Sequence, residues 1–125
     1  KNGIDKRMKK EKISDWSRLR QFMDFRLSMM QEELDETKTA VKEKNPEEVV
    51  DGIIDLCVFA IGTLEVFGVD AHKAWDQVYH ANMSKEVGIK KGRPNPLGLP
   101  ELVKPKDWIG PSHEGNHGNI SDSFQ

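Results

Sequence analysis

The chain has 125 residues and a net charge of −2 at pH 7, and its sequence pI is about 6.1. This length fits one domain. The net charge is close to zero, so the protein as a whole does not attract anionic nucleic acid or a membrane surface, and we expect neither as a partner. The single cysteine, Cys57, excludes an intrachain disulfide framework. We therefore expect a cytoplasmic protein in which Cys57 is an inert thiol in the core.

Residues 1–13 are rich in lysine and lack apolar periodicity, which predicts a flexible basic arm. A helix is predicted to begin at Ser14-Asp15, because both residues are good N-caps and Trp16 follows them. Beyond Trp16, apolar residues recur at spacings of three and four, which extends this helix to about Lys44.

A second helix is predicted from Asn45 to Phe67. Asn45 is a good cap, Pro46 suits the first helical position, and two acids follow in the first turn. Gly68 is placed to end the helix as a C′ glycine. The interior of this helix is apolar almost all round, which is typical of a buried helix.

Asp70 then caps a third helix that runs to about Lys85. Short connections favour antiparallel neighbours, so we predict an all-α antiparallel helical bundle over residues 14–88 as the catalytic core. Residues 89–125 are rich in proline and glycine, which predicts an irregular extension with a short hairpin at most. The end of this extension, residues 112–125, is predicted to be disordered.

Two groups of carboxylates fall on consecutive predicted helices. Asp55 lies within an almost unbroken apolar run, and Asp51 precedes it by one helical turn on the same face. A buried carboxylate is strongly unfavourable unless a cation accompanies it. The preceding helix carries a further cluster at Glu32, Glu33 and Glu36. Two facing helices that each present acids predict a site for a hard divalent metal ion.

Polar and basic residues follow at the end of the third helix and beyond it. Asn82 and Lys85 are placed to reach an anion held by the metal ion, and Lys91 and Arg93 could neutralise phosphates. A helix macrodipole also favours a cation at the C-terminal end of a helix, which would explain Lys85 without any function.

These motifs together resemble the MazG-like superfamily of all-α nucleoside triphosphate pyrophosphohydrolases, which includes dimeric dUTPases, dCTP pyrophosphatases and phosphoribosyl-ATP pyrophosphohydrolases. The resemblance covers roughly residues 20–110 and rests on EELDE (32–36), DGIIDLCVFAIGTLEVFGVD (51–70) and HANMSK (80–85). The run DLCVFAIG is more similar to the dimeric nucleotide pyrophosphatases than to the histidine-synthesis enzymes. The superfamily pattern ExxD has Gly52 in place of its glutamate here, and Asp51 stands one residue earlier as the substitute.

The resemblance implies an enzyme that uses Mg²⁺, with Mn²⁺ as a substitute, to hydrolyse nucleoside triphosphates to monophosphates and pyrophosphate. It implies that the metal ligands are Glu33, Glu36, Asp51 and Asp55. Glu32 would bind a metal ion or would orient and deprotonate the attacking water, so catalytic roles fall on Glu32 and Glu33.

The resemblance also implies that Asn82 and Lys85 hold the substrate phosphates, with Lys91 and Arg93 as helpers. It implies a homo-oligomer, either a dimer or a tetramer. Two alternatives stay open. One is an enzyme of the same fold that acts on phosphoribosyl-ATP in histidine synthesis. The other is a non-catalytic helical interaction module, which a buried ion pair between Arg26 and Asp55 would favour.

Overall fold

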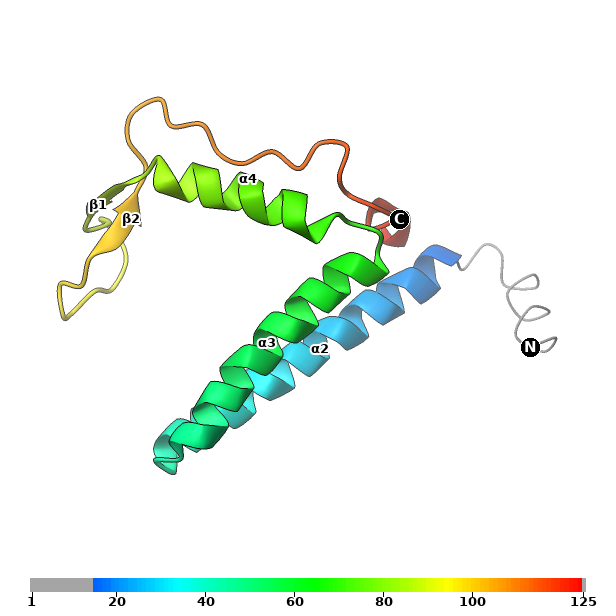
Figure 1. The fold of residues 1–125 in the computed structure, drawn as a ribbon, viewed down its shortest axis with the longest axis horizontal. Coiled ribbons are helices and arrows are strands. Elements are labelled where there is room, and N and C mark those ends of the chain that lie inside the picture. The colour runs from blue at the N-terminus through cyan, green and yellow to red at the C-terminus, as the bar shows by residue number, and fades with distance from the viewer. Residues whose placement is uncertain (1–14, 125) are drawn as a thin grey trace. The chain divides into compact units, whose positions relative to one another are not determined.

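The computed structural model describes residues 15–124, shown in colour in Figure 1. These residues form three α-helices, a two-stranded antiparallel sheet and a short 3-10 helix. They divide into two compact units, unit 1 with residues 15–69 and 117–124 and unit 2 with residues 70–116. The predicted all-α fold class is confirmed, and the predicted basic arm lies outside the described residues.

Unit 1 is built on an antiparallel pair of long helices, α2 (Asp15–Lys42) and α3 (Pro46–Val66), which lie side by side in Figure 1. Asn45 caps α3 as predicted, because its side-chain oxygen accepts a hydrogen bond from the Glu48 backbone N–H at 3.2 Å. Pro46 occupies the first helical position, where its missing N–H is not needed.

The C-terminal end of α3 is closed by Gly68, as predicted. Gly68 has a φ of +77°, which favours glycine, and its N–H donates to the Glu65 carbonyl oxygen at 2.9 Å. The Val69 N–H donates to the Leu64 carbonyl oxygen at 3.0 Å, which completes a Schellman motif. The buried Phe67 ring next to this turn stands 5.7 Å from the Phe22 ring of α2.

The tail of the chain is ordered up to residue 124, which corrects the prediction of disorder for residues 112–124, and residue 125 lies outside the described residues. The Asn119 N–H donates to the Phe67 carbonyl oxygen at 2.8 Å, and the short helix η2 (Ser121–Ser123) packs against α2. Ser123 is fully buried. A segment rich in glycine, serine and asparagine appeared structureless in sequence, but it supplies a backbone donor for a carbonyl at the end of α3.

Unit 2 contains α4 (Ala71–Met83) and the strands β1 (Glu86–Gly88) and β2 (Glu101–Val103). The two strands pair antiparallel with Val87 opposite Leu102, so a short hairpin is present, and its first strand lies before residue 89. Asp70 caps α4, as predicted, by accepting from the Lys73 N–H at 3.0 Å. The buried Asn116 side chain binds both the N–H and the carbonyl oxygen of Asp70, so it ties the end of this unit to its beginning.

The apolar character of α3 does not lead to burial on all sides in the single chain. Ile53, Ile54 and Val58 are 50%, 55% and 62% exposed. The expectation that Cys57 is a core thiol is wrong for the single chain, because its side chain is exposed. The reason is that within unit 1 α3 packs along one side against α2. No single helix among residues 15–124 is both long and apolar enough to cross a membrane, and α3 and α4 pass that test only when taken together.

Candidate functional site

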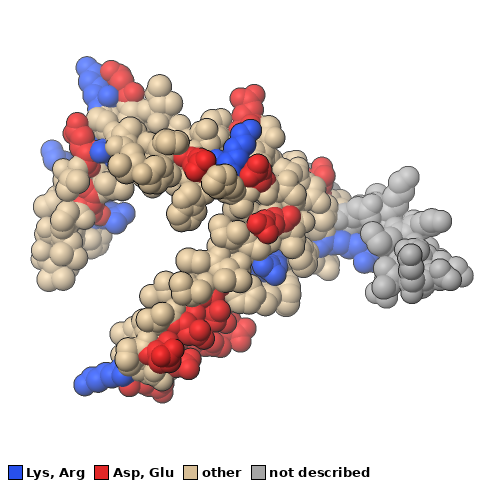
Figure 2. Space-filling model, in the orientation of Figure 1, with Lys and Arg blue, Asp and Glu red and all other residues tan. Residues whose placement is uncertain are grey.

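A small acidic cavity lies between α2 and α3, and its volume is about 90 Å³. Its lining residues are Glu33, Glu36 and Thr37 of α2 with Glu48, Asp51, Gly52 and Asp55 of α3. Figure 2 shows acidic side chains gathered on this helix pair. The structure therefore brings together the four predicted metal ligands, which come from two motifs separated along the chain.

The two helices come close to one another beside this cavity because Gly52 has no side chain. Gly52 is buried against Thr37, and a Cβ at position 52 would overlap Thr37 Oγ1 and stand 3.2 Å from Thr37 Cβ. Thr37 itself is held by a hydrogen bond from Oγ1 to the Glu33 carbonyl oxygen at 2.7 Å. A glutamate side chain therefore has no room at position 52, whereas Asp51, one residue earlier, lines the cavity.

Several carboxylates crowd around Glu33, which is half-buried. Burial raises the pKa of Glu33 above its ordinary value, and the nearby carboxylates of Glu36, Asp55, Glu32 and Asp51 raise it further. Carboxylates from both helices therefore act on the same group. A cation bound among them would relieve this repulsion and would return the pKa of Glu33 toward its usual range.

The donor set fits Mg²⁺ in its chemistry, because this ion prefers carboxylate oxygens and keeps several waters and substrate oxygens as further ligands. As the side chains lie, no three acidic, histidine or cysteine side chains among residues 15–124 converge closely enough to hold an ion. One or two carboxylates with waters meet the requirement of Mg²⁺. The side chains of Glu36 and Asp51 are exposed and free to rotate toward an ion.

Arg26 does not form the ion pair with Asp55 that would favour a purely structural role for this carboxylate. Its Nε donates to Thr63 Oγ1 at 2.9 Å, and its Nη2 donates to the Phe59 carbonyl oxygen at 3.2 Å. Its guanidinium also lies over the Phe59 ring at 5.4 Å from the centroid. Within the described residues no ion pair joins Arg26 to Asp55.

Two acidic residues differ from the predicted site, because Glu32 lies outside the acidic cavity and Glu48 lies inside it. Glu32 does not line the acidic cavity but lines a wider groove of about 610 Å³ on α2, which Glu36 also lines. Glu48 does line the acidic cavity, and sequence reasoning missed it. The signal was present, because Glu48, Asp51 and Asp55 follow one another at spacings of three and four on a single helical face.

The predicted phosphate-binding residues all belong to unit 2, whereas the acids belong to unit 1. Asn82 and Lys85 are half-buried at the C-terminal end of α4, and Lys91 is exposed. Their approach to the acids stays a prediction.

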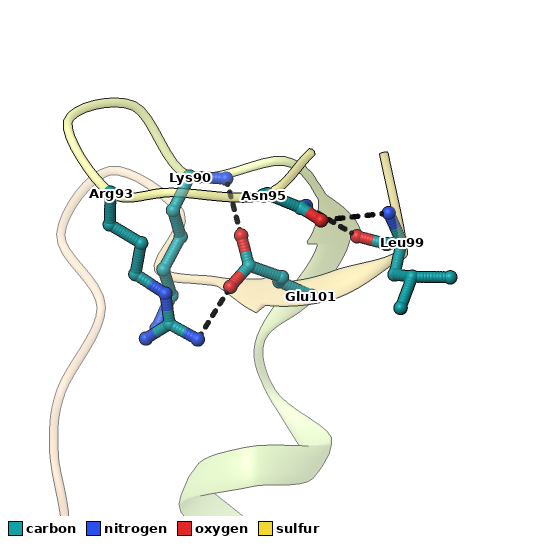
Figure 3. A network of polar contacts seen from close by, with 5 residues as sticks. All are labelled: Lys90, Arg93, Asn95, Leu99 and Glu101. Atoms are coloured by element: carbon teal, nitrogen blue, oxygen red, sulfur yellow. Dashed lines mark hydrogen bonds and ion pairs between the residues drawn. The ribbon is translucent and has the colours of Figure 1, made fainter. Parts of the chain in front are cut away.

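Arg93 is already paired with a carboxylate, because its Nη2 stands 2.7 Å from Glu101 Oε1. Figure 3 shows that the Glu101 carboxylate also accepts from the Lys90 backbone N–H. Asn95 bonds both backbone groups of Leu99 in the same loop. A substrate phosphate would have to compete with Glu101 for Arg93, so the loop geometry favours a structural role for this arginine as it lies.

Comparison with known proteins gave one match, to a protein family. No curated protein and no solved structure matched the chain in the searches. The sequence profile of the phosphoribosyl-ATP pyrophosphohydrolase family matches residues 4–82, which include α2, α3 and nearly all of α4. The members of this family are hydrolases that act on acid anhydrides and release pyrophosphate from a nucleotide. The match spans both acidic helices and more than half of the chain, and the chain therefore belongs to the phosphoribosyl-ATP pyrophosphohydrolase family.

Proposed function

We propose that the chain is a Mg²⁺-dependent nucleotide pyrophosphohydrolase that cleaves a triphosphate between its α- and β-phosphates. The observation that carries this proposal is the cavity in which Glu33 and Glu36 of α2 meet Asp51 and Asp55 of α3. Water forms a bond to the α-phosphorus while the bond from this phosphorus to the bridging oxygen breaks. The products are a monophosphate and pyrophosphate.

The acids of the cavity hold the metal ion, with Glu33, Glu36 and Asp55 as ligands and Asp51 completing the set. Bound Mg²⁺ supplies charge neutralisation at the phosphate oxygens and lowers the pKa of a bound water. Glu33 lines the same cavity and would belong to the catalytic set as a ligand that holds the ion beside the attacking water. Glu32, on the adjacent face of α2, is the candidate for orienting the attacking water.

Two substrate classes share the chemistry that this site requires. The first is a nucleoside or deoxynucleoside triphosphate, as the resemblance of DLCVFAIG to the dimeric dUTPases and dCTP pyrophosphatases suggests. The second is phosphoribosyl-ATP, which the family match supports at least as well. Both carry a triphosphate chain, so the acidic cavity serves either, and contacts to the base and sugar decide between them.

A substrate panel tests this proposal. Incubation with phosphoribosyl-ATP and with each NTP and dNTP in the presence of Mg²⁺ is expected to release pyrophosphate and a monophosphate, identified by ³¹P NMR. Mn²⁺ should replace Mg²⁺, and excess chelator should abolish the activity, because without the cation the anionic carboxylates would repel the triphosphate. Activity that persists undiminished in chelator, or products that are a diphosphate and phosphate, would rule the proposal out.

We further infer that the chain assembles as a homo-oligomer in which a second copy covers the exposed apolar face of α3. Val58 and Ile54 lie on this face beside the exposed Cys57. Contiguous exposed apolar surface of this kind is typical of protein–protein contacts, and closed symmetric assemblies are the commonest arrangement.

Light scattering is expected to give at least twice the mass of the 14.3 kDa chain. Val58→Glu should shift the assembly toward the single chain, because the new charge would be desolvated at the contact. Val87→Glu is the matched control, since Val87 is more exposed than Val58 but belongs to β1 and not to the apolar face of α3. A wild-type protein with the mass of one chain at assay concentration would count decisively against assembly.

A further inference from the structure

The Trp108 side chain is held against the C-terminal end of α4. Its indole Nε1–H donates to the Ala81 carbonyl oxygen at 3.0 Å and to Ser84 Oγ at 2.8 Å. Gly110 also lies close to the ring, where a Cβ would stand only 3.3 Å from Cζ3. Two hydrogen bonds and this close approach give the half-buried ring a defined position.

Two lysines approach this ring from separate segments of unit 2. Lys85 directly follows the cap of α4, and its Nζ stands 5.0 Å from the ring centroid. Lys104 directly follows β2, and its Nζ stands 5.2 Å from the same centroid. The two ammonium groups can therefore be no further apart than the sum of these distances.

Neither lysine forms an ion pair with a carboxylate of residues 15–124. The carboxylate of Glu101, three residues before Lys104 in the chain, is already engaged by Arg93 and by the Lys90 N–H. Two like charges held at one ring repel each other, and the attraction of each for the ring offsets this only in part. An anion with several charged oxygens could contact both ammonium groups and relieve their repulsion.

We propose that Lys104 binds a condensed phosphate together with Lys85, and that Trp108 is the positioning residue that brings the two lysines together. The ligand is the polyphosphate chain of the substrate or the pyrophosphate that is released from it, since both present the same oxygens to two compact ammonium groups. This inference rests on the proposed function and on the expectation from the family resemblance that Lys85 holds the substrate phosphates, and it adds Lys104 and Trp108 to that contact.

Calorimetric titration with inorganic pyrophosphate in the presence of EDTA tests the inference without any catalytic step. Lys104→Gln is expected to weaken binding about tenfold, the loss typical of one charge-assisted hydrogen bond. Lys104→Arg should keep most of the affinity, because it keeps the charge. Lys106→Gln is the matched control, since this exposed lysine lies two residues further along the same segment and is not one of the two lysines placed over the ring.

The role of Trp108 is tested by a double-mutant cycle. Trp108→Phe keeps an aromatic ring but loses both Nε1 hydrogen bonds, so Lys104→Gln should weaken binding far less in this background than in the wild type. Thermal melts by circular dichroism confirm that each variant is folded. Additive effects of the two substitutions would overturn the positioning role of Trp108.

Equal pyrophosphate affinities for Lys104→Gln and Lys106→Gln, or no binding by the wild type, would overturn the proposal for Lys104. If Mg²⁺-dependent hydrolysis proceeds normally in Lys104→Gln, this proposal fails while the proposed function stands. If no nucleotide is hydrolysed but pyrophosphate binding depends on Lys104, the proposed function fails and the phosphate site stands. Dependence of the substrate KM on Lys104, together with the calorimetric result, would assign the site to the substrate.

Discussion

Asp55→Asn is expected to lower pyrophosphohydrolase activity by about 10²–10³-fold or more, which is the scale of losing a group that stabilises transition-state charge. The apo protein should be as stable as the wild type or more stable, because asparagine is nearly isosteric and removes one of the charges that raise the pKa of Glu33. The wild type should gain about 2.7 kcal/mol when Mg²⁺ is present at a hundred times its Kd, and the variant should gain much less.

Activity assays and thermal melts with and without Mg²⁺ measure these effects. Asp24→Asn is the matched control, because this exposed aspartate of α2 pairs with Arg20 at 3.2 Å and does not line the acidic cavity. The Asp24→Asn substitution should leave activity intact and change the free energy of unfolding by less than about 1 kcal/mol. If Asp55→Asn instead lowers the free energy of unfolding of the apo protein by about 3–5 kcal/mol, a buried cation has lost its partner and Asp55 has a structural role.

Gly118→Ala is expected to lower the free energy of unfolding by about 3 kcal/mol. Gly118 has a φ of +54°, where an alanine is disfavoured by about 1–2 kcal/mol. A Cβ at this position would also overlap the Phe67 carbonyl oxygen and stand 2.7 Å from the Gly68 carbonyl carbon, and such crowding adds about 1–3 kcal/mol. The melting temperature should fall by more than about 10 °C.

The tail can escape this overlap only by leaving the end of α3. Hydrogen exchange should therefore speed up at the Asn119 amide, whose N–H is bonded to the Phe67 carbonyl oxygen. Gly115→Ala is the matched control, because Gly115 has a φ of +75° but no atom within 4 Å of a Cβ, so it isolates the backbone contribution. Identical melting temperatures for the two variants would mean that residues 117–124 do not dock on α3.

Local signals in the sequence were sufficient to predict the helices and the face of the second helix that carries the acids. Asn45 with Pro46, Gly68, and Asp70 each act on backbone groups within a few residues, so the predicted helix ends are those of α3 and α4 to within about two residues. The 3.6-residue period places Asp51 and Asp55 on one face of their helix without knowledge of any partner. Family membership also follows from the residues in order along the chain.

Contacts between distant residues decided what the sequence alone could not. The close approach of Gly52 to Thr37 leaves no room for a glutamate at position 52, and the cavity beside this contact includes Glu48, which sequence reasoning had passed over. The exposure of Cys57 depends on which side of α3 meets α2, and a helix that is apolar all round carries no local signal for that choice.

The same limit applies to the tail and to unit 2. The order of residues 117–124 depends on Gly118 fitting against Phe67, about fifty residues earlier, and no periodicity of a short polar segment encodes such a fit. The gathering of Lys85 and Lys104 at Trp108 depends on where the hairpin returns the chain to α4. The sequence by itself therefore determined the helices, the positions of the acids along them and the superfamily, whereas tertiary packing decided which side chains line the acidic cavity and which lysines meet at the Trp108 ring.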